Sequence, residues 1–232
     1  LRQLSNNMFA IYKKELGHYF NNPFGYILVI LATLIVNILF IRDIYSVGLV
    51  SMKSFFITMY WVLAFLIPAL CMRSFAEERK LGTLETILTM PIGEKEIVLG
   101  KLSAVLSLIG VTFILSLLLP ISFALISGLY LPEVFVGYFG LILVSGMFST
   151  LSLYISLKTS NQVLSFFIST VILVCLSIFS ADVLASFIPI AISEMLIPLT
   201  PLPNLDNFTK GIIDLRALFY FLSFTGVFMY AV

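Results

Sequence analysis

Charged residues are scarce in this sequence. Only 11% of its 232 residues are Asp, Glu, Lys or Arg, whereas a soluble domain carries roughly a quarter. Hydrophobic residues make up 60%, in blocks as long as a membrane span rather than at amphipathic spacing. The formal net charge is +1, and the basic residues form no run and no patch interleaved with aromatic residues. The composition therefore excludes an ordinary soluble domain and a nucleic-acid-binding surface, and it predicts an integral membrane protein.

Residue types that usually carry catalysis are also few. There is one histidine, His18, and the two cysteines, Cys71 and Cys175, lie in apolar segments without metal-site spacing. No H-E-x-x-H or G-x-S-x-G motif occurs. The nearest match to a nucleotide-binding loop, residues 93–102, has its glycines too far apart and a leucine where serine or threonine binds the metal. We therefore expect no enzyme active site, cofactor site or metal site in this chain.

Six apolar segments predict six membrane spans within one all-α domain, residues 1–232. The first span, at ~1.5 Å per residue, covers roughly 27 Å, close to the thickness of a bilayer core. The predicted spans are residues 24–41, 54–72, 102–127, 134–157, 163–185 and 215–232. Spans one to five carry no charge except Asp182, which weakens the hypothesis of an ion-coupled transporter. Their scattered Ser and Thr residues indicate helix packing, with a substrate path as the alternative.

Residues 5–20 are predicted to form an amphipathic helix. Apolar and aromatic residues recur at three- and four-residue spacing, while the other side carries Lys13, Lys14, Glu15 and His18. Such a helix suits the interface between membrane and water. Pro23 disfavours helix at the preceding asparagine and so ends it.

Residues 186–214 predict a different structure. They are apolar but interrupted by prolines at positions 189, 198, 201 and 203, so no continuous span fits. Short helices that lie at the membrane surface or dip into it fit better.

The basic residues predict the orientation. With the amino terminus and the loop 73–101 inside the cell, nine of the 13 basic residues face inward: Arg2, Lys13, Lys14, Arg73, Arg79, Lys80, Lys95, Lys101 and Lys158. The other four, Arg42, Lys53, Lys210 and Arg216, face outward. This asymmetry agrees with the positive-inside rule, so both segments are predicted to be cytoplasmic.

The loop 73–101 is the longest charge-rich interval and is predicted to meet a soluble partner. Gly82 breaks the chain, Thr83 is a plausible helix N-cap, and Glu85 follows in the first turn. The resulting short helix has an apolar side made of Leu84, Ile87 and Leu88. The alternative is a loop that is simply solvated, but that does not explain an apolar side within so polar a segment.

Two stretches of this sequence resemble a known family. Residues 77–91 fit the pattern E-E-R-K-x-G-T-L-E-x-[IL]-L-x-x-P, and residues 12–26 contain Y-K-K-E-L and N-N-P-F-G-Y. Both resemble type 2 ABC exporter permeases, the first as their coupling segment. Residues 72–80, M-R-S-F-A-E-E-R-K, are most similar to the gliding-motility-associated branch.

The resemblance implies a permease subunit of an ATP-binding-cassette exporter in the bacterial inner membrane. It implies pairing with a second permease copy or homologue and with two cytoplasmic ATPase subunits, which bind ATP and Mg²⁺. It also implies a coupling helix over residues 82–91 and outer re-entrant helices before the last span. The residues expected to contact the ATPase are Glu77, Glu78, Arg79, Gly82, Thr83, Leu84, Glu85, Ile87, Leu88 and Pro91. The alternative function is a membrane scaffold or assembly factor that transports nothing.

Overall fold

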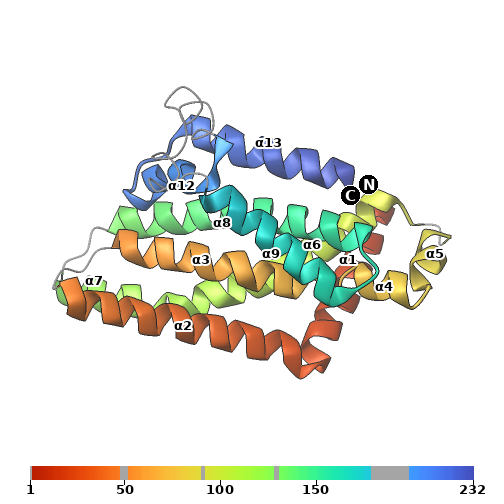
Figure 1. Ribbon diagram of the computed structural model, residues 1–232, viewed down its shortest axis with the longest axis horizontal. Coiled ribbons are helices and arrows are strands. Elements are labelled where there is room, and N and C mark those ends of the chain that lie inside the picture. The colour runs from red at the N-terminus through yellow and green to blue at the C-terminus, as the bar shows by residue number, and fades with distance from the viewer. Residues whose placement is uncertain (1, 48–51, 90–91, 128–130, 179–198) are drawn as a thin grey trace.

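The computed structural model describes residues 2–47, 52–89, 92–127, 131–178 and 199–232 (Figure 1). Every regular element in these ranges is a helix, which confirms the all-α prediction for the part of the chain described. The helices are α1 (Arg2–Asn21), α2 (Pro23–Val47), α3 (Met52–Cys71), α4 (Ala76–Lys80), α5 (Thr83–Leu88), α6 (Glu94–Ser116), α7 (Leu118–Ser127), α8 (Leu131–Lys158), α9 (Gln162–Ile178), α12 (Pro201–Thr209) and α13 (Leu215–Ala231).

Four helical stretches are long and apolar enough to cross a membrane, namely Pro23–Tyr45, Met52–Lys80, Glu94–Phe123 and Pro132–Lys158. They coincide with the first four predicted spans. α9 and α13 fall in the predicted fifth and sixth spans but have only 17 residues each. Residues 179–185 of the predicted fifth span lie outside the described ranges. The chain is thus a multi-pass helical membrane protein with four candidate spans and two shorter apolar helices.

The contact between α3 and α8 forms the centre of the bundle. α8 packs against α3, α9, α12 and α13, and α3 also packs against α2. Aromatic rings fill the contact, with the centroids of Tyr60 and Phe148 5.4 Å apart. Gly137 allows close approach, because a Cβ there would lie 2.2 Å from the ring of Phe56. α3 is therefore firmly seated on the core up to the point where the polar loop begins.

The third predicted span begins earlier than expected. The sequence predicts a short charged helix over residues 92–100 that leads into a span beginning at residue 102, whereas a single helix, α6, starts at Glu94 and includes Lys101. Gly93 is extended, and Glu94 and Glu96 in the first turn favour the positive end of the helix. Further along, Pro120 has no N–H to donate to the carbonyl of Ser116. α6 therefore ends at Ser116, and a second helix, α7, begins at Leu118.

α1 lies across one end of the bundle, at a steep angle to α2 (Figure 1). It covers the predicted residues 5–20 but starts earlier, at Arg2. The prediction that Glu15 lies on the solvated side is wrong, because Glu15 is buried, while Lys13, Lys14 and His18 are exposed. The cause is a buried partner, Lys101, in a helix far along the sequence.

α12 lies at the opposite end of the bundle, within the region predicted to hold short helices (Figure 1). Pro201 starts this helix rather than breaking it, because a proline at the first helical position needs no N–H partner. Asp206 of α12 pairs with Lys53 of α3 at 2.6 Å, and Phe208 packs against Gly140 of α8. Residues 186–198 lie outside the described ranges.

Candidate functional site

The link between α3 and α6 projects beyond the ends of the neighbouring helices (Figure 1). We call residues 76–88, which comprise α4, α5 and the turn between them, the α4–α5 arm. Gly82 reverses the chain with φ +70°, a conformation that side chains with a Cβ disfavour. Leu81, just before the turn, is 68% exposed. The arm therefore presents a large apolar side chain at its tip.

The carboxyl end of α8 braces the arm. The hydroxyl of Ser156 accepts hydrogen bonds from the backbone N–H groups of Phe75 (3.2 Å) and Ala76 (3.1 Å). It thus caps α4 from another helix, since the N-cap residue Phe75 has no side-chain cap of its own. Arg79 Nη1 also donates to the carbonyl of Leu157 at 2.9 Å. These bonds fix the base of the arm against a core helix.

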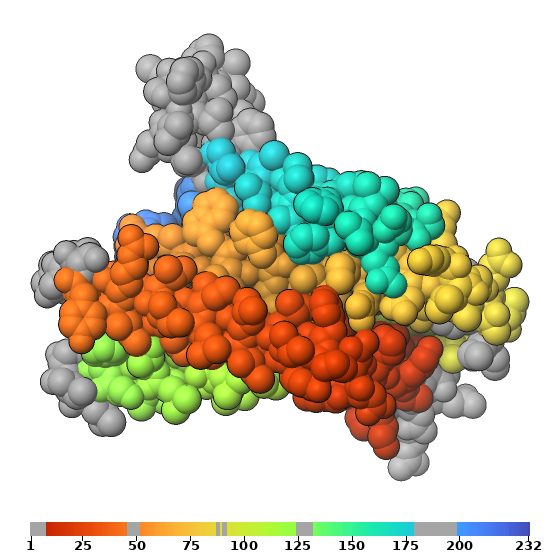
Figure 2. All heavy atoms as spheres, turned by 60° about the horizontal axis from the view of Figure 1, so that its bottom comes forward, coloured from red at the N-terminus to blue at the C-terminus, as the bar shows by residue number. Residues whose placement is uncertain are grey.

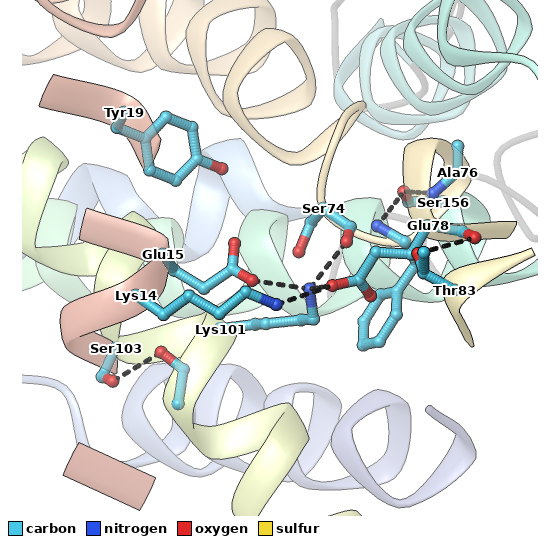
Figure 3. A network of polar contacts seen from close by, with 12 residues as sticks. Lys14, Glu15, Tyr19, Ser74, Ala76, Glu78, Thr83, Lys101, Ser103 and Ser156 are labelled. Atoms are coloured by element: carbon cyan, nitrogen blue, oxygen red, sulfur yellow. Dashed lines mark hydrogen bonds and ion pairs between the residues drawn. The ribbon is translucent and has the colours of Figure 1, made fainter. Parts of the chain in front are cut away.

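A buried lysine ties the arm to α1 and α6. The side chain of Lys101 is 2% exposed, and its Nζ lies 2.8 Å from Glu15 Oε1 and 3.0 Å from Glu78 Oε1 (Figure 3). It also donates to the carbonyl of Ser74 at 2.7 Å. These partners come from α1, from the turn after α3 and from α4, so we call the four residues the Lys101 junction. One ammonium group joins three segments to α6.

The Lys101 junction is charged, and its charges depend on one another. A buried ion costs several kcal/mol unless it is paired and hydrogen-bonded, and here one cation serves two carboxylates. Lys14 Nζ lies 3.9 Å from Glu78 Oε1 at the rim and supplies a second, exposed cation. Tyr19 adds a neutral link, because its hydroxyl donates to the carbonyl of Leu70 at 2.7 Å. Burial raises the pKa of Tyr19 well above its ordinary value, so its phenol keeps the proton that it donates.

The architecture is thus a multi-pass apolar bundle with a polar arm fixed between two of its long helices. A family model described as ABC-2 family transporter protein matches residues 9–232. The chain belongs to this family. It is an ABC-2 type permease, the membrane component of an ABC transporter, and the family implies a system with ATPase partners. Permeases of this kind are generally not catalytic themselves. A search of the curated proteins found no match.

The exposed part of the permease arm holds half of the residues that the sequence assigned to ATPase contact. Arg79, Gly82, Thr83 and Glu85 are exposed, and Glu77 is partly exposed. Thr83 is the first residue of α5 rather than its N-cap, and its hydroxyl donates to a carbonyl of α4. Leu81, which the sequence analysis did not select, is exposed in the turn between α4 and α5 and lines a pocket with Lys13 and Lys14 of α1.

The remaining assigned residues have other positions. Glu78 points into the bundle as part of the Lys101 junction. Leu84 is partly buried and lines a hollow of about 390 Å³ with Leu157 and Lys158 of α8, so it faces the permease itself. The side chains of Ile87 and Leu88 and the whole of Pro91 lie outside the described residues.

The sequence analysis missed the Lys101 junction, although one signal for it was present. Lys101 is followed by an apolar run, and an ionisable residue inside a membrane helix usually has a buried partner. Its partner Glu15 lies 86 positions earlier, on the polar side of an amphipathic pattern. Sequence spacing alone does not connect two residues that far apart.

Proposed function

We propose that this permease works in an ATP-driven exporter. Separate ATPase subunits bind ATP and Mg²⁺, and this chain forms the transmembrane path with a second permease copy or homologue. The α4–α5 arm docks on an ATPase subunit and passes its movement to the membrane helices. The observation that carries the proposal is the arm itself, a projecting polar segment with an apolar tip, continuous with two long core helices.

The exposed tip has the composition of a protein–protein contact. Leu81 is 68% exposed, and the exposed residues around it include Arg79, Lys80 and Glu85. A central apolar side chain inside a charged rim is the arrangement in which a few residues carry most of the binding energy. We assign Leu81 to the centre of the contact and Glu77, Arg79, Gly82, Thr83 and Glu85 to its rim. Ile87, Leu88 and Pro91 remain assigned from the sequence pattern.

Two residues of the original assignment take other roles in the proposal. Glu78 positions the arm through Lys101 instead of touching the ATPase. Leu84 packs the arm against α8, so a charged substitution at Leu84 would disturb the permease as well as any docked partner. A docking test should therefore use Leu81.

The Lys101 junction provides a physical route for coupling. The arm follows α3 and is braced to α8 by Ser156 and Arg79. Lys101 links it to α6 and, through Glu15, to α1. A movement of the docked arm would therefore displace α1, α3 and α6 together and change the path at the interface between permeases.

We place the arm and α1 in the cytoplasm and the chain in the inner membrane. α1, the arm and the carboxyl end of α8, which is Lys158, lie at one end of the bundle, and α12 lies at the other, where Asp206 pairs with Lys53 of the first turn of α3 (Figure 1). The basic residues are thus concentrated at the arm end, in agreement with the positive-inside rule. Residues 72–80 further support the gliding-motility branch as the nearest part of the family. In the proposed assembly, α9 and α13 are the fifth and sixth spans. A second permease completes the transmembrane path.

Co-purification with the ATPase tests the proposal. The permease, purified in mild detergent from its native membrane, is expected to bring with it a protein that carries a Walker motif and hydrolyses ATP. Leu81→Asp should reduce the ATPase recovered by about tenfold or more, because it places a charge in the centre of the contact. Ile213→Asp is the matched control, since Ile213 is 56% exposed but lies beyond α12, far from the arm. If the wild-type permease and the Ile213→Asp control are both intact but neither brings an ATPase with it, the result would favour a non-transporting scaffold.

A further inference from the structure

A polar pocket of about 500 Å³ lies between α1 and the start of the arm. Its basic lining comes from Lys13 and Lys14 on α1 and from Arg73 after α3, and His18 of α1 also lines it. Arg73 Nε is buried and has no hydrogen-bond partner among the described residues. The guanidinium is held by stacking, with its Cζ 4.2 Å from the centroid of the Phe24 ring. This leaves a fixed planar donor group facing a hollow beside two lysines.

The acidic residues of the pocket neutralise these cations only in part, with Lys14 Nζ 3.9 Å from Glu78 Oε1. Glu15 and Glu78 also line it, but both lie within 3.0 Å of the Lys101 ammonium and are compensated from inside the protein. Glu77 is the third carboxylate, and the described structure gives it no ion pair. With Lys101, which lies behind Glu15 and Glu78, the lysine and arginine side chains at the pocket number four against three carboxylates, so a net positive charge favours an anion.

A separate apolar groove of about 490 Å³ begins about one helical turn from the Arg73 side of the pocket. Leu28 of α2 and Ala69 of α3 line the end of this groove nearest the pocket. Leu28 lies about one helical turn after Phe24, and Ala69 lies about one turn before Arg73, which stacks on the Phe24 ring. The groove runs between α2 and α3 as far as Phe166 of α9. Figure 2 looks onto this face, where α2 and α9 lie on either side of α3 and α1 lies beside α4 at one end. Cations at the end of an apolar groove match an amphiphile with an anionic head.

We propose that this site binds one anionic phospholipid from the leaflet on the side of α1. The phosphate lies between Arg73 and the two lysines, where a guanidinium fork forms paired charge-assisted hydrogen bonds with phosphate oxygens. An acyl chain follows the groove between α2 and α3. Exposed aromatic residues at this level, Phe20 and Tyr26, are typical of a membrane–water boundary. The proposal depends on the chain being a membrane protein and not on the ATPase contact.

Native mass spectrometry of the purified full chain, titrated with phosphatidylglycerol, tests the head site. We expect one tightly bound lipid, and about tenfold or more weaker binding in Arg73→Gln, which removes a charged donor. Lys13→Gln/Lys14→Gln changes two exposed residues, so a similar loss of lipid binding with an unchanged melting temperature is expected from the lost charges and not from unfolding. Glu77→Gln should tighten binding severalfold, because it removes a repulsive charge. Lys80→Gln is the control, since Lys80 is exposed but does not line the pocket.

Substitution in the groove tests the position of the acyl chain. Ala69→Phe fills the groove and should weaken phosphatidylglycerol binding severalfold, whereas Ala10→Phe, at an exposed position on α1, should not. Inorganic phosphate serves as the second probe. If it displaces phosphatidylglycerol, the pocket takes a free phosphate and the lipid proposal is overturned. Equal binding of phosphatidylcholine, or unchanged binding in both the Arg73 and the lysine variants, would overturn it as well.

Discussion

Removal of the buried ammonium of Lys101 is the most informative perturbation of this permease. Lys101→Met keeps a long flexible side chain but leaves Glu15, whose side chain is 10% exposed, without its cation, and leaves Glu78, which is 14% exposed, with only the exposed Lys14 at 3.9 Å. Breaking a buried ion pair by removing one partner costs about 3–5 kcal/mol. Since Glu15 is the buried charge that attaches α1 to α6, we expect this cost to appear as detachment of α1.

Hydrogen exchange followed by mass spectrometry measures that detachment. If α1 opens as a unit, a loss of about 3 kcal/mol accelerates the exchange of its backbone amides by about 100-fold. Amides in the centre of α3 and α8 should change much less, because those helices pack through aromatic contacts away from the Lys101 junction. Lys95→Met, an exposed residue of the same helix, should stay within about 0.5 kcal/mol of the wild type.

A compensating variant separates charge from packing. Adding Glu15→Gln and Glu78→Gln to Lys101→Met removes the unpaired charges, and replacing a whole buried ion pair with neutral groups is often close to neutral. We therefore expect the triple variant to recover most of the protection lost from α1. Two results would show that the ion pairs do not hold α1 in place. One is that the α1 amides of Lys101→Met exchange as slowly as those of Lys95→Met. The other is that the α1 amides exchange faster in the triple variant than in Lys101→Met.

Three further predictions concern the framework around the site. Gly137→Ala should lower the midpoint of thermal unfolding by the equivalent of about 1–3 kcal/mol through overpacking, while Gly110→Ala, with open space at its Cβ, should not. Ser156→Ala should cost about 0.5–2 kcal/mol and expose the first amides of α4 to exchange, because it removes the hydroxyl that accepts their hydrogen bonds. Burial acts to raise the pKa of Asp206, but hydrogen bonds from two lysines outweigh it and hold that pKa below the ordinary 3.8. The stabilisation is therefore present above about pH 4 and is lost as pH falls through the lower folded pKa, so the melting temperatures of wild type and Asp206→Asn should converge in acid.

The sequence predicted the apolar helices well because a membrane span is a local property. A block of about 20 apolar residues is sufficient to identify a spanning helix, and four of the six predicted spans have such helices. The boundaries were less predictable where charge and span meet. Residues 92–100 were predicted as a short charged helix ahead of the third span, but they form the first turns of the same helix α6, whose acidic first turn favours helix.

The site itself was predictable only in part. The arm, its Gly82 turn and its exposed charges follow from local pattern, and the positive φ of Gly82 agrees with the predicted break. The exposure of each apolar residue did not follow from the pattern, because it depends on tertiary contacts: Leu84 is partly buried against the core, whereas Leu81 is 68% exposed at the edge of a pocket beside α1. The pairing of Glu15 with Lys101 joins residues 86 positions apart, and no periodicity records such a contact.

Photocrosslinking from the tip of the arm tests the central claim most directly. A photoreactive amino acid is placed at position 81 in cells, and the crosslinked product is identified by mass spectrometry. Docking of the arm predicts a covalent adduct with a Walker-motif ATPase, and no such adduct from the same probe at position 213. An ATPase that co-purifies with the permease but never crosslinks from position 81 would contradict the assignment of the α4–α5 arm as the coupling element.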